Sequence, residues 1–183
     1  MHLETKRLIL RDLDFSDRHS FFEYGRCPKV GPNAGWKPFL SQAISDRVLS
    51  GLILSKETYA IALKETNRCI GTISLYHTTL RKYSKVRSLG FSLHEDYWNQ
   101  GLMTEAVKAI VDYAFTKTDC EILEAGHHIG NTASKRVIEK CGFLYDGTFC
   151  SYKKLYDGRL IDADFYSLKR SEYERMKEQW KTN

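Results

Sequence analysis

The chain has 183 residues, 42% hydrophobic and 28% charged, a size and balance that fit one folded domain and exclude a disordered chain. Its formal charge of +5 includes no run of five like charges, so no nucleic-acid-binding tail is expected. No apolar stretch approaches the ~20 residues of a membrane span, and the first residues lack the apolar segment of a signal peptide. We therefore expect one domain over residues 1–183, in the cytoplasm, without a membrane or direct nucleic-acid partner.

The first part of the chain predicts a strand, a short helix, a loop and a second helix. Arg7 to Leu13 alternates as a strand does, and Ser16 is placed to cap a helix that continues through Tyr24. Cys27 to Phe39 holds all three prolines and is expected to be a loop. Ser41 to Leu54 carries apolar residues at helical spacing, which predicts an amphipathic helix.

The pattern then changes to strands. Tyr59 to Leu63 and Cys69 to Tyr76 are rich in β-formers, and the polar segment Lys64 to Arg68 between them predicts a hairpin. Val86 to Leu93 predicts a third strand, and Met103 to Phe115 predicts an amphipathic helix whose apolar face lies on a sheet.

The last part predicts alternating strands and helices. In chain order these are a strand at Ile122 to Ile129, a helix at Asn131 to Cys141 ended by Gly142, strands at Phe143 to Tyr152 and Leu160 to Leu168, and a helix at Ser171 to Trp180. Hairpins followed by a strand-helix-strand passage imply an α/β (α+β) fold, in which helices flank a mixed sheet.

The five cysteines are odd in number and contain no Cys-x-x-Cys pair, so neither zinc binding nor a redox pair is indicated. We expect reduced thiols packed in the core, and no metal site. The residues concerned are Cys27, Cys69, Cys120, Cys141 and Cys150.

The segment after the third strand is the most informative one. A strand, a polar turn with one glycine and a helix follow one another, and the first N–H groups of such a helix have no internal partners. These groups lie at the positive end of the helix dipole and can bind a pyrophosphate, which Gly101 allows to approach closely. Thr104 is placed to add a hydroxyl. An ordinary capped helix would show the same pattern, because a single glycine is a weak motif.

The residues from Trp98 to Met103 resemble the acyl-coenzyme A motif of the GNAT acetyltransferases, Gln/Arg-x-x-Gly-x-Gly/Ala. Gly101 is the strict match, whereas Trp98 and Met103 depart from the motif. The run from Tyr97 to Ala106 is similar to the Tyr-Trp-x-x-Gly-x-x-Thr-Glu-Ala of the Rim-type branch, which acetylates N-termini of ribosomal proteins.

Three other stretches resemble the same branch in the same order. Leu3 to Arg11 looks like its opening strand, Asn131 to Phe143 like its second cofactor motif, and Tyr166 to Leu168 like its last strand. The resemblance implies the GNAT fold, with a mostly antiparallel sheet, and acetyl-CoA as co-substrate. Its implied cofactor-binding residues are Phe91, Ser92, Leu93, Asn99, Gln100, Gly101, Leu102, Met103, Thr104, Asn131 and Lys135.

Two residues of the predicted second motif are catalytic candidates. Asn131 is placed to cap its helix, and the resemblance implies that it also contacts the pantetheine arm. Ser134 shares a helical face with apolar residues, where its hydroxyl can bond the carbonyl one turn back. The resemblance instead implies a place near the thioester sulfur, where Ser134 would protonate the departing thiolate, since Ile138 stands where many family members have Tyr.

The general base is open. The Glu often found on the central strand is replaced by Ser88, which leaves His77, His94 and Glu95 as alternatives. An α-amine, with a pKa of about 7.7–8.0, is neutral in roughly a tenth of molecules at pH 7, whereas lysine is neutral in under roughly one in a thousand. We therefore expect direct attack by a protein N-terminal α-amine on a carbonyl polarised by main-chain N–H groups of Phe91 or Leu93. The resemblance implies that this acceptor is of ribosomal-protein type.

Other acceptors and roles are compatible with the sequence. The amine acceptor could be a polyamine, an amino acid or an aminoglycoside, and the chain could be a non-catalytic acyl-CoA sensor that lost its base. We expect Trp36 and Phe39 to line the substrate cleft, and we leave open whether the chain forms a homodimer.

Overall fold

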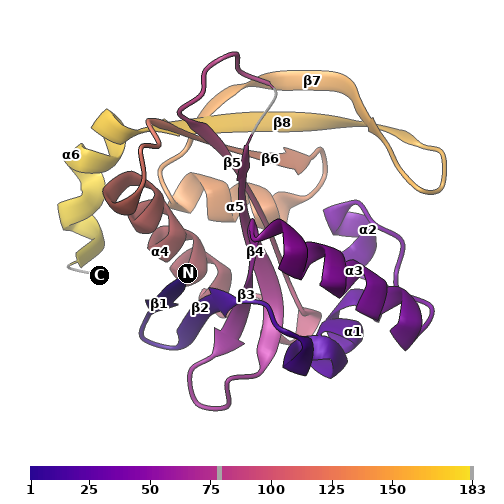
Figure 1. Cartoon of the computed structure of the whole chain (residues 1–183). Helices are drawn as coiled ribbons and strands as arrows, with labels where there is room; N and C mark the ends of the chain where they lie inside the picture. Colours follow the sequence, from indigo (N-terminus) through magenta and orange to yellow (C-terminus); the bar gives the residue numbers. More distant parts are fainter. Residues whose placement is uncertain (78–79, 182–183) are drawn as a thin grey trace.

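An eight-stranded sheet runs through the molecule in the computed structural model, which describes residues 1–77 and 80–181. The strands lie in the order β1-β2-β3-β4-β5-β6-β8-β7 (Figure 1), and all neighbours are antiparallel except β5 and β6, which are parallel. The mixed, mostly antiparallel sheet is therefore confirmed. The strands are β1 (His2–Glu4), β2 (Leu8–Asp12), β3 (Thr58–Leu63), β4 (Cys69–His77), β5 (Val86–Leu93), β6 (Ile122–His128), β7 (Leu144–Lys154) and β8 (Leu160–Lys169).

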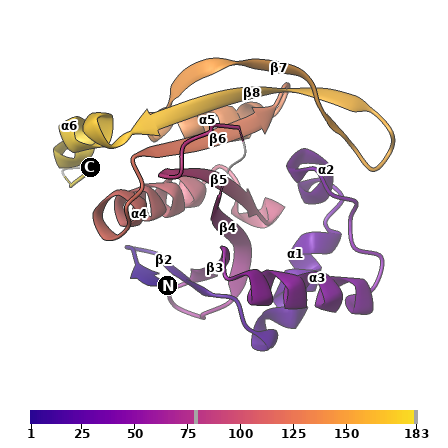
Figure 2. The ribbon, with the colours of Figure 1, turned by 45° about the horizontal axis from the view of Figure 1, so that its top comes forward.

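Six helices cover the two faces of this sheet. Helices α4, α5 and α6 pack on one face, and α1, α2 and α3 lie on the other (Figures 1 and 2). Within the described part of the chain, none of the helices has the length and hydropathy needed to cross a bilayer. The helices are α1 (Arg18–Arg26), α2 (Val30–Ala34), α3 (Gln42–Ser55), α4 (Leu102–Lys117), α5 (Thr132–Lys140) and α6 (Arg170–Lys181).

The larger hydrophobic core lies under α4. The apolar stripe of α4 is completely buried against the sheet, as its amphipathic pattern predicts, and it comprises Ala106, Val107, Ile110, Val111 and Ala114. The burial of this stripe fixes the direction of α4 and hence the position of its first turn, because a one-residue rotation would expose part of the stripe.

A smaller core holds α1, α2 and α3 against the opposite face. Phe21 and Tyr24 of α1, Val30 of α2 and Leu49 of α3 are buried together in it. Phe21 and Tyr24 also contact each other edge to face, with ring centroids 5.7 Å apart. These contacts fix the three helices beside the centre of the sheet.

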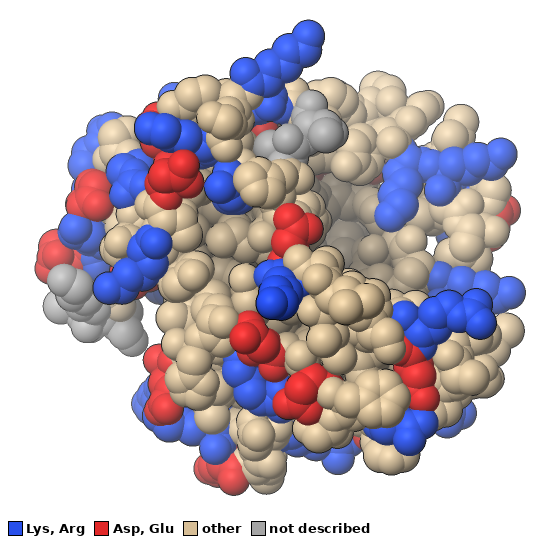
Figure 3. All heavy atoms as spheres, in the orientation of Figure 1, with Lys and Arg blue, Asp and Glu red and all other residues tan. Residues whose placement is uncertain are grey.

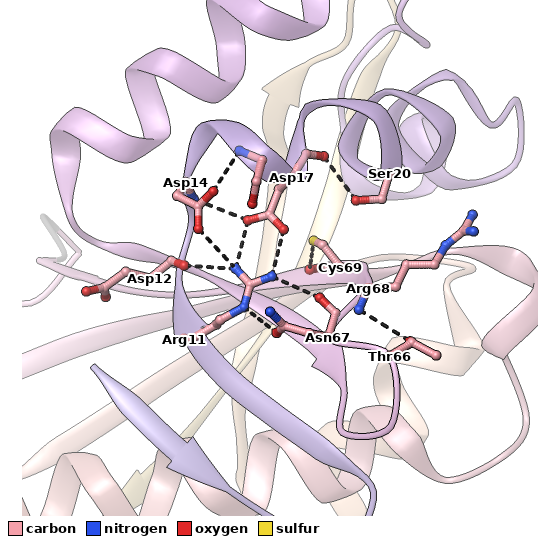
Figure 4. A network of polar contacts seen from close by, with 11 residues as sticks. Arg11, Asp12, Asp14, Asp17, Ser20, Thr66, Asn67, Arg68 and Cys69 are labelled. Carbon is pink, nitrogen blue, oxygen red and sulfur yellow. Dashed lines mark hydrogen bonds and ion pairs between the residues drawn. The ribbon is translucent and has the colours of Figure 1, made fainter.

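A buried ion pair connects the start of α1 to the sheet (Figure 4). The guanidinium of Arg11 on β2 donates to both carboxylate oxygens of Asp17, at 2.7 and 2.8 Å, and to Asn67 Oδ1 at 2.8 Å. Asp17 is 3% exposed, so this carboxylate depends on Arg11 for its counter-charge. The contacts fix the β2–α1 connection and the β3–β4 turn relative to each other.

Several local predictions were wrong. Ser16 is not the cap: Asp14 accepts from the Ser16 N–H at 2.6 Å in a 3-10 turn, and α1 begins later, at Arg18. The expected loop contains α2, because Pro32 lies in the first turn of this helix, where a missing N–H has no consequence. Leu3 to Arg11, expected as one opening strand, is divided into two antiparallel strands, β1 and β2, with a turn at residues 5–7 between them.

The cysteine prediction was right for four thiols and wrong for one. Cys27, Cys69, Cys120 and Cys141 are buried, whereas Cys150 is exposed. The reason is that Cys150 lies on β7, an edge strand with most of its residues exposed to solvent.

Candidate active site

The two parallel strands at the centre of the sheet pair over only part of their length. The pairing covers Val86–Leu89 of β5 and Ile122–Ala125 of β6. Beyond it, residues 90–93 stay paired with β4, and residues 126–128 stay paired with β8. β5 and β6 therefore diverge and leave a gap in the middle of the sheet.

The main chain of β5 directs alternate residues toward this gap. Successive residues of an antiparallel strand present their N–H and C=O groups to opposite edges. The His94 N–H donates to Ile70 O at 2.8 Å, which places the even-numbered residues toward β4 and places Phe91 and Leu93 toward the gap. The bond that the Leu93 carbonyl accepts from Trp98 Nε1, at 2.7 Å, supports this orientation, because it lies away from β4.

The same alternation applies to β6 on the other side of the gap. The Ile129 N–H donates to Asp162 O at 3.0 Å, in the direction of β8, so the main-chain groups of Gly126 and His128 face β5. The gap thus offers main-chain donors and acceptors from two strands, an arrangement suited to an extended polar ligand.

Helix α4 begins beyond the end of β5 with its first N–H groups uncapped. Gly101 is the N-cap, with φ of 75°, and Asn99 before it also has positive φ, 59°. Among the described residues no side chain caps this helix, and the side chains of Leu102 and Met103 are turned into the core. The N–H groups of residues 102–104 are therefore available to an anion. The departure of Met103 from the family motif therefore leaves the main chain of this turn intact.

Arg7, which the sequence did not single out, fixes this turn. Its guanidinium donates to Gln100 O at 2.9 Å and to Glu105 Oε2 at 2.8 Å, and its own N–H donates to Glu105 Oε1 at 2.8 Å. Burial raises the pKa of Glu105, but its bonds to Thr5 and Arg7 lower it further, so that the pKa lies below the usual value. The turn is thereby fixed to the start of β2.

The first turn of α5 faces the gap from the other side. Asn131 Oδ1 accepts from the Ser134 N–H at 3.1 Å, so the predicted capping role of Asn131 is observed. Asn131 Nδ2 also donates to Asn33 O of α2 at 3.3 Å. Within the described residues the Ser134 hydroxyl donates to no carbonyl, and Ser134 lines the cleft beside Asn131. The bond to the preceding turn that the sequence allows is therefore absent.

A cleft of about 460 Å³ extends from the gap between the β7–β8 hairpin and the helices of the smaller core. Figure 3 shows its mouth as a hollow with mostly uncharged walls, and with lysine and arginine side chains along the outer edge. Trp36 and Phe39 both line the cleft, as predicted from the sequence, together with Tyr152 and Phe165 of the hairpin.

A group of hydroxyl-bearing side chains lines one part of the cleft. Tyr24 Oη bonds Thr72 Oγ1 at 3.0 Å and also contacts Ser92 Oγ, and burial raises the pKa of Tyr24 to about 12. Tyr76 lies over the strand at Gly90, where an added Cβ would be 2.7 Å from its hydroxyl. Glycine at this position therefore lets the phenol reach the cleft.

The predicted cofactor and catalytic residues fall into three groups. Phe91, Ser92, Asn131 and Ser134 line the cleft. Leu93 and the residues from 99 to 104 lie along the end of β5 and the start of α4. Lys135 stands apart, since its ammonium is 3.8 Å from Glu139 on the exposed side of α5.

The candidate bases His77, His94 and Glu95 are not among the residues that line the cleft. Ser88, which replaces the Glu often found on the central strand, does line it. The ring of His94 accepts from the Asp96 N–H at 3.2 Å, and Glu95 pairs with Lys29 at 2.7 Å, so these two groups are engaged elsewhere. Bonds to Lys29 and Cys27 lower the pKa of Glu95.

Two histidines that the sequence did not single out line the cleft instead. They are adjacent at the end of β6, so their side chains point to opposite faces. His127 is buried and packs on Tyr166, with Nε2 3.3 Å from Oη. His128 faces α2 and β7. The signal available in the sequence was a histidine pair that Ile129 separates from Gly130 and Asn131, but histidines at strand ends are common on protein surfaces.

A split parallel pair beside an uncapped helix that can receive a pyrophosphate defines an acyl-CoA-dependent acyltransferase. The chain belongs to the GNAT acetyltransferases: residues 7–144 match the family described as acetyltransferase (GNAT) domain. It is therefore an N-acetyltransferase that uses acetyl-CoA.

Relatives and solved structures agree with this assignment. The uncharacterized N-acetyltransferase p20 of Bacillus licheniformis is 30% identical over 93% of this chain and 97% of its own length. A GNAT-family acetyltransferase from Bacillus anthracis has the same fold, with a TM-score of 0.84 at 20% identity over 93% of this chain and 99% of that one. RimL, a ribosomal L7/L12 alpha-N-protein acetyltransferase solved in complex with coenzyme A, gives a TM-score of 0.77 at 19% identity over 92% and 98%.

Proposed function

We propose that this enzyme acetylates the N-terminal α-amine of a protein, with a ribosomal protein as the acceptor class. The observation that carries the proposal is the charge of the cleft. Among the described residues that line it there is no aspartate or glutamate, and the cation Lys153 is present. A polyamine or aminoglycoside would bring several positive charges without a counter-charge, and the net charge of +5 would slow its approach.

An α-amine fits the same cleft better. It brings one positive charge and needs less help to lose its proton than a lysine does, because its pKa is about 7.7–8.0. The hollow in Figure 3 opens to solvent, and the N-terminus of a protein acceptor would enter there. The similar RimL structure is that of a ribosomal-protein acetyltransferase, which supports the same acceptor class.

We assign the pyrophosphate of acetyl-CoA to the turn at the start of α4. Main-chain N–H groups would hold it at residues 101–104, with Asn99 and Gln100 shaping the turn and the Thr104 hydroxyl beside it. Lys135 would meet the 3'-phosphate from α5. The pantetheine arm would then run through the gap, between the main chain of β5 at residues 91–93 and Asn131.

With this placement, the acetyl group lies where β5 and β6 diverge. The N–H of Phe91 or Leu93 polarises the thioester carbonyl, and the amine nitrogen attacks the carbonyl carbon directly. As the C–S bond breaks, its electron pair stays on sulfur, and the Ser134 hydroxyl passes a proton to the thiolate. The proton that the nitrogen loses as the amide forms restores the Ser134 hydroxyl. No covalent enzyme intermediate is required.

We also propose that residues 1–183 form a single domain and act in the cytoplasm. One sheet contains strands from both ends of the described chain, from β1 to β8. Acetyl-CoA and a ribosomal acceptor would both be available in the cytoplasm.

The acceptor is tested by measuring thiol release from acetyl-CoA. Each peptide is offered twice, with a free and with an acetyl-blocked N-terminus, and spermidine, an aminoglycoside and free amino acids are assayed in parallel. We expect turnover with the free N-terminus and none with its blocked counterpart. Continued acetylation of blocked peptides would transfer the assignment to lysine, and turnover only with the small amines would overturn it. Binding of acetyl-CoA without any turnover would favour the sensor.

A further inference from the structure

The side chain of His128 lies on the cleft side of β6, just beyond the gap. Alternate residues of the strand share a face, so His128 points to the same side as Glu124 and Gly126, opposite to the buried Leu123 and Ala125. Gly126 borders the gap, and His128 follows about 6–7 Å further along the strand. An acceptor that enters the cleft toward the gap therefore passes the imidazole.

The imidazole of His128 is free of polar partners within the described residues. Its main-chain carbonyl accepts from other groups, but across residues 1–77 and 80–181 no hydrogen bond to a ring nitrogen of His128 is present. The neighbouring His127 has its ring engaged by Tyr166 and by the His128 carbonyl. Of the two histidines, only His128 has a ring that can exchange a proton with a ligand in the cleft.

The ring of His128 faces one cation and, among the described residues, no carboxylate. Against the ring lie Gly35 at the end of α2 and Lys153 of β7: an added Cβ on Gly35 would be 3.2 Å from His128 Cε1 and 2.9 Å from Lys153 Nζ. On β8 its partner is Ala163. Asp162 and Asp164 flank this partner but point to the opposite face, where Asp164 Oδ2 is 3.8 Å from His127 Nε2. Burial, and after it Lys153 and His127, lower the pKa of His128 below its ordinary value near 6.5. The imidazole is therefore neutral at pH 7, the form that accepts a proton.

Glu124 is the other buried candidate on this face. It is 3% exposed, and one carboxylate oxygen has no hydrogen-bond partner within the described chain. Its other oxygen accepts from Arg81 Nε at 2.5 Å, and Arg81 also pairs with Asp146. Glu124 does not line the cleft, and Arg81 neutralises its charge, so it is less suited to meet an acceptor amine than His128.

We propose that His128 is the catalytic residue that removes the proton from the acceptor amine. The proposal rests on the placement of the acetyl group in the gap, given above. The ammonium gives one proton to the His128 imidazole, which passes it to solvent. The freed electron pair forms the C–N bond, the C–S bond breaks toward sulfur, and the second proton lost by nitrogen balances the one gained by the thiolate.

The test is the pH dependence of kcat/KM in three variants, with whichever acceptor the enzyme acetylates. For the wild type, the decrease of kcat/KM on the acidic side of the pH profile (the acidic limb) should lie below pH 6.5, at the pKa of His128. In His128→Gln only the neutral amine can react, and because roughly a tenth of an α-amine is neutral at pH 7, kcat/KM at that pH should fall about tenfold. The limb should then move up to the pKa of the acceptor, about 7.7–8.0 for an α-amine.

Lys153→Met gives an independent measurement on an exposed residue. Removal of the positive charge beside the imidazole should raise the pKa of His128, and the acidic limb should shift to higher pH with the same slope. His19→Gln, at an exposed position on α1 outside the cleft lining, is the matched control and should leave the profile unchanged.

Acetyl-CoA titration of each variant separates this proposal from the acceptor assignment. His128→Gln should bind acetyl-CoA as the wild type does. An unchanged pH profile in His128→Gln, or a loss confined to acetyl-CoA affinity, would overturn the role of His128. The identity of the acceptor depends only on which compound in the panel reacts, so either conclusion can fail alone.

Discussion

Ser134 is the residue whose proposed role is easiest to isolate, because its hydroxyl lines the cleft while its N–H bonds Asn131. Replacement of Ser134 by alanine keeps the main-chain bond to Asn131 and removes only the hydroxyl. We expect kcat to fall roughly 10²-fold, as for the loss of a proton donor, with acetyl-CoA affinity unchanged. Steady-state kinetics together with calorimetric titration measure both quantities.

Thr132→Ala is the matched control for this prediction, since Thr132 is exposed on the same helix. It should leave kcat unaltered. An equal turnover of wild type and Ser134→Ala would return Ser134 to a packing role and leave a water molecule as the proton donor.

Arg11 should contribute to stability rather than to catalysis. Its side chain is 14% exposed, and it supplies the counter-charge of Asp17, which is 3% exposed. Arg11→Met leaves that carboxylate buried without a counter-charge, with the Asp14 N–H still donating to it at 3.2 Å, and should reduce the free energy of unfolding by about 3–5 kcal/mol. The midpoint of urea unfolding measures the change.

The double variant Arg11→Met with Asp17→Asn should recover part of the loss, because the buried negative charge is then removed. A loss below about 1 kcal/mol for Arg11→Met alone would mean that water reaches Asp17, and that the pair behaves as a surface ion pair.

Residue identities could be predicted where the interaction is local. Asn131 is followed three residues later by the N–H it accepts, so its capping role is readable from the sequence. His128 was not predictable, because its surroundings come from Gly35 and Lys153, which are distant in the chain. Arg7 was missed for the same reason: its partner Glu105 lies 98 residues away.

At the scale of elements, the turn before α4 depends on its positive φ values. Gly101 has φ of 75°, a conformation that a β-branched residue adopts only with strain. Its Cβ would meet no close atom, since the nearest is Arg7 Nη2 at 3.6 Å, so conformation rather than space limits substitution. Gly101→Val should therefore shift the turn and weaken acetyl-CoA binding by about tenfold or more, because 1–2 kcal/mol of strain is near a factor of ten.

Gly101→Asn is the matched comparison, because asparagine tolerates positive φ, as Asn99 does with φ of 59°. It should bind acetyl-CoA more tightly than the valine variant in the same titration. Equal affinities of wild type and Gly101→Val would remove the pyrophosphate from this turn.

Elements with a long and regular pattern were predictable, whereas short ones were not. Helix α4 shows its stripe over 16 residues, and the β3–β4 hairpin has a polar turn between two apolar runs. The gap between β5 and β6 leaves no sequence pattern, because both strands continue with the same alternation after they separate. It arises from their pairing with β4 and β8, which only the assembled sheet contains.

At the scale of the whole molecule, the sheet is interrupted in its interior where acetyl-CoA is proposed to bind. β5 and β6 share pairs at only four positions, from Val86 to Leu89, while β4 and β5 share seven. One half of the sheet lies with α1, α2 and α3, and the other contains the β7–β8 hairpin (Figure 2). A ligand that hydrogen-bonds both edges of the gap would replace the missing pairs and connect the two halves.

Acetyl-CoA should therefore stabilise the entire chain, which we propose to be a single domain. At a concentration of about 100 times Kd, a ligand that binds only the folded state adds about 2.7 kcal/mol. For a chain of this size each kcal/mol raises Tm by about 2–4 °C, so the transition should move up by roughly 5–10 °C and stay single. Circular dichroism and tryptophan fluorescence, recorded on heating with and without acetyl-CoA, measure it. If only one of the two probes moved, the halves would be unfolding separately and the single-domain assignment would fail, and the absence of any shift would contradict binding in the gap.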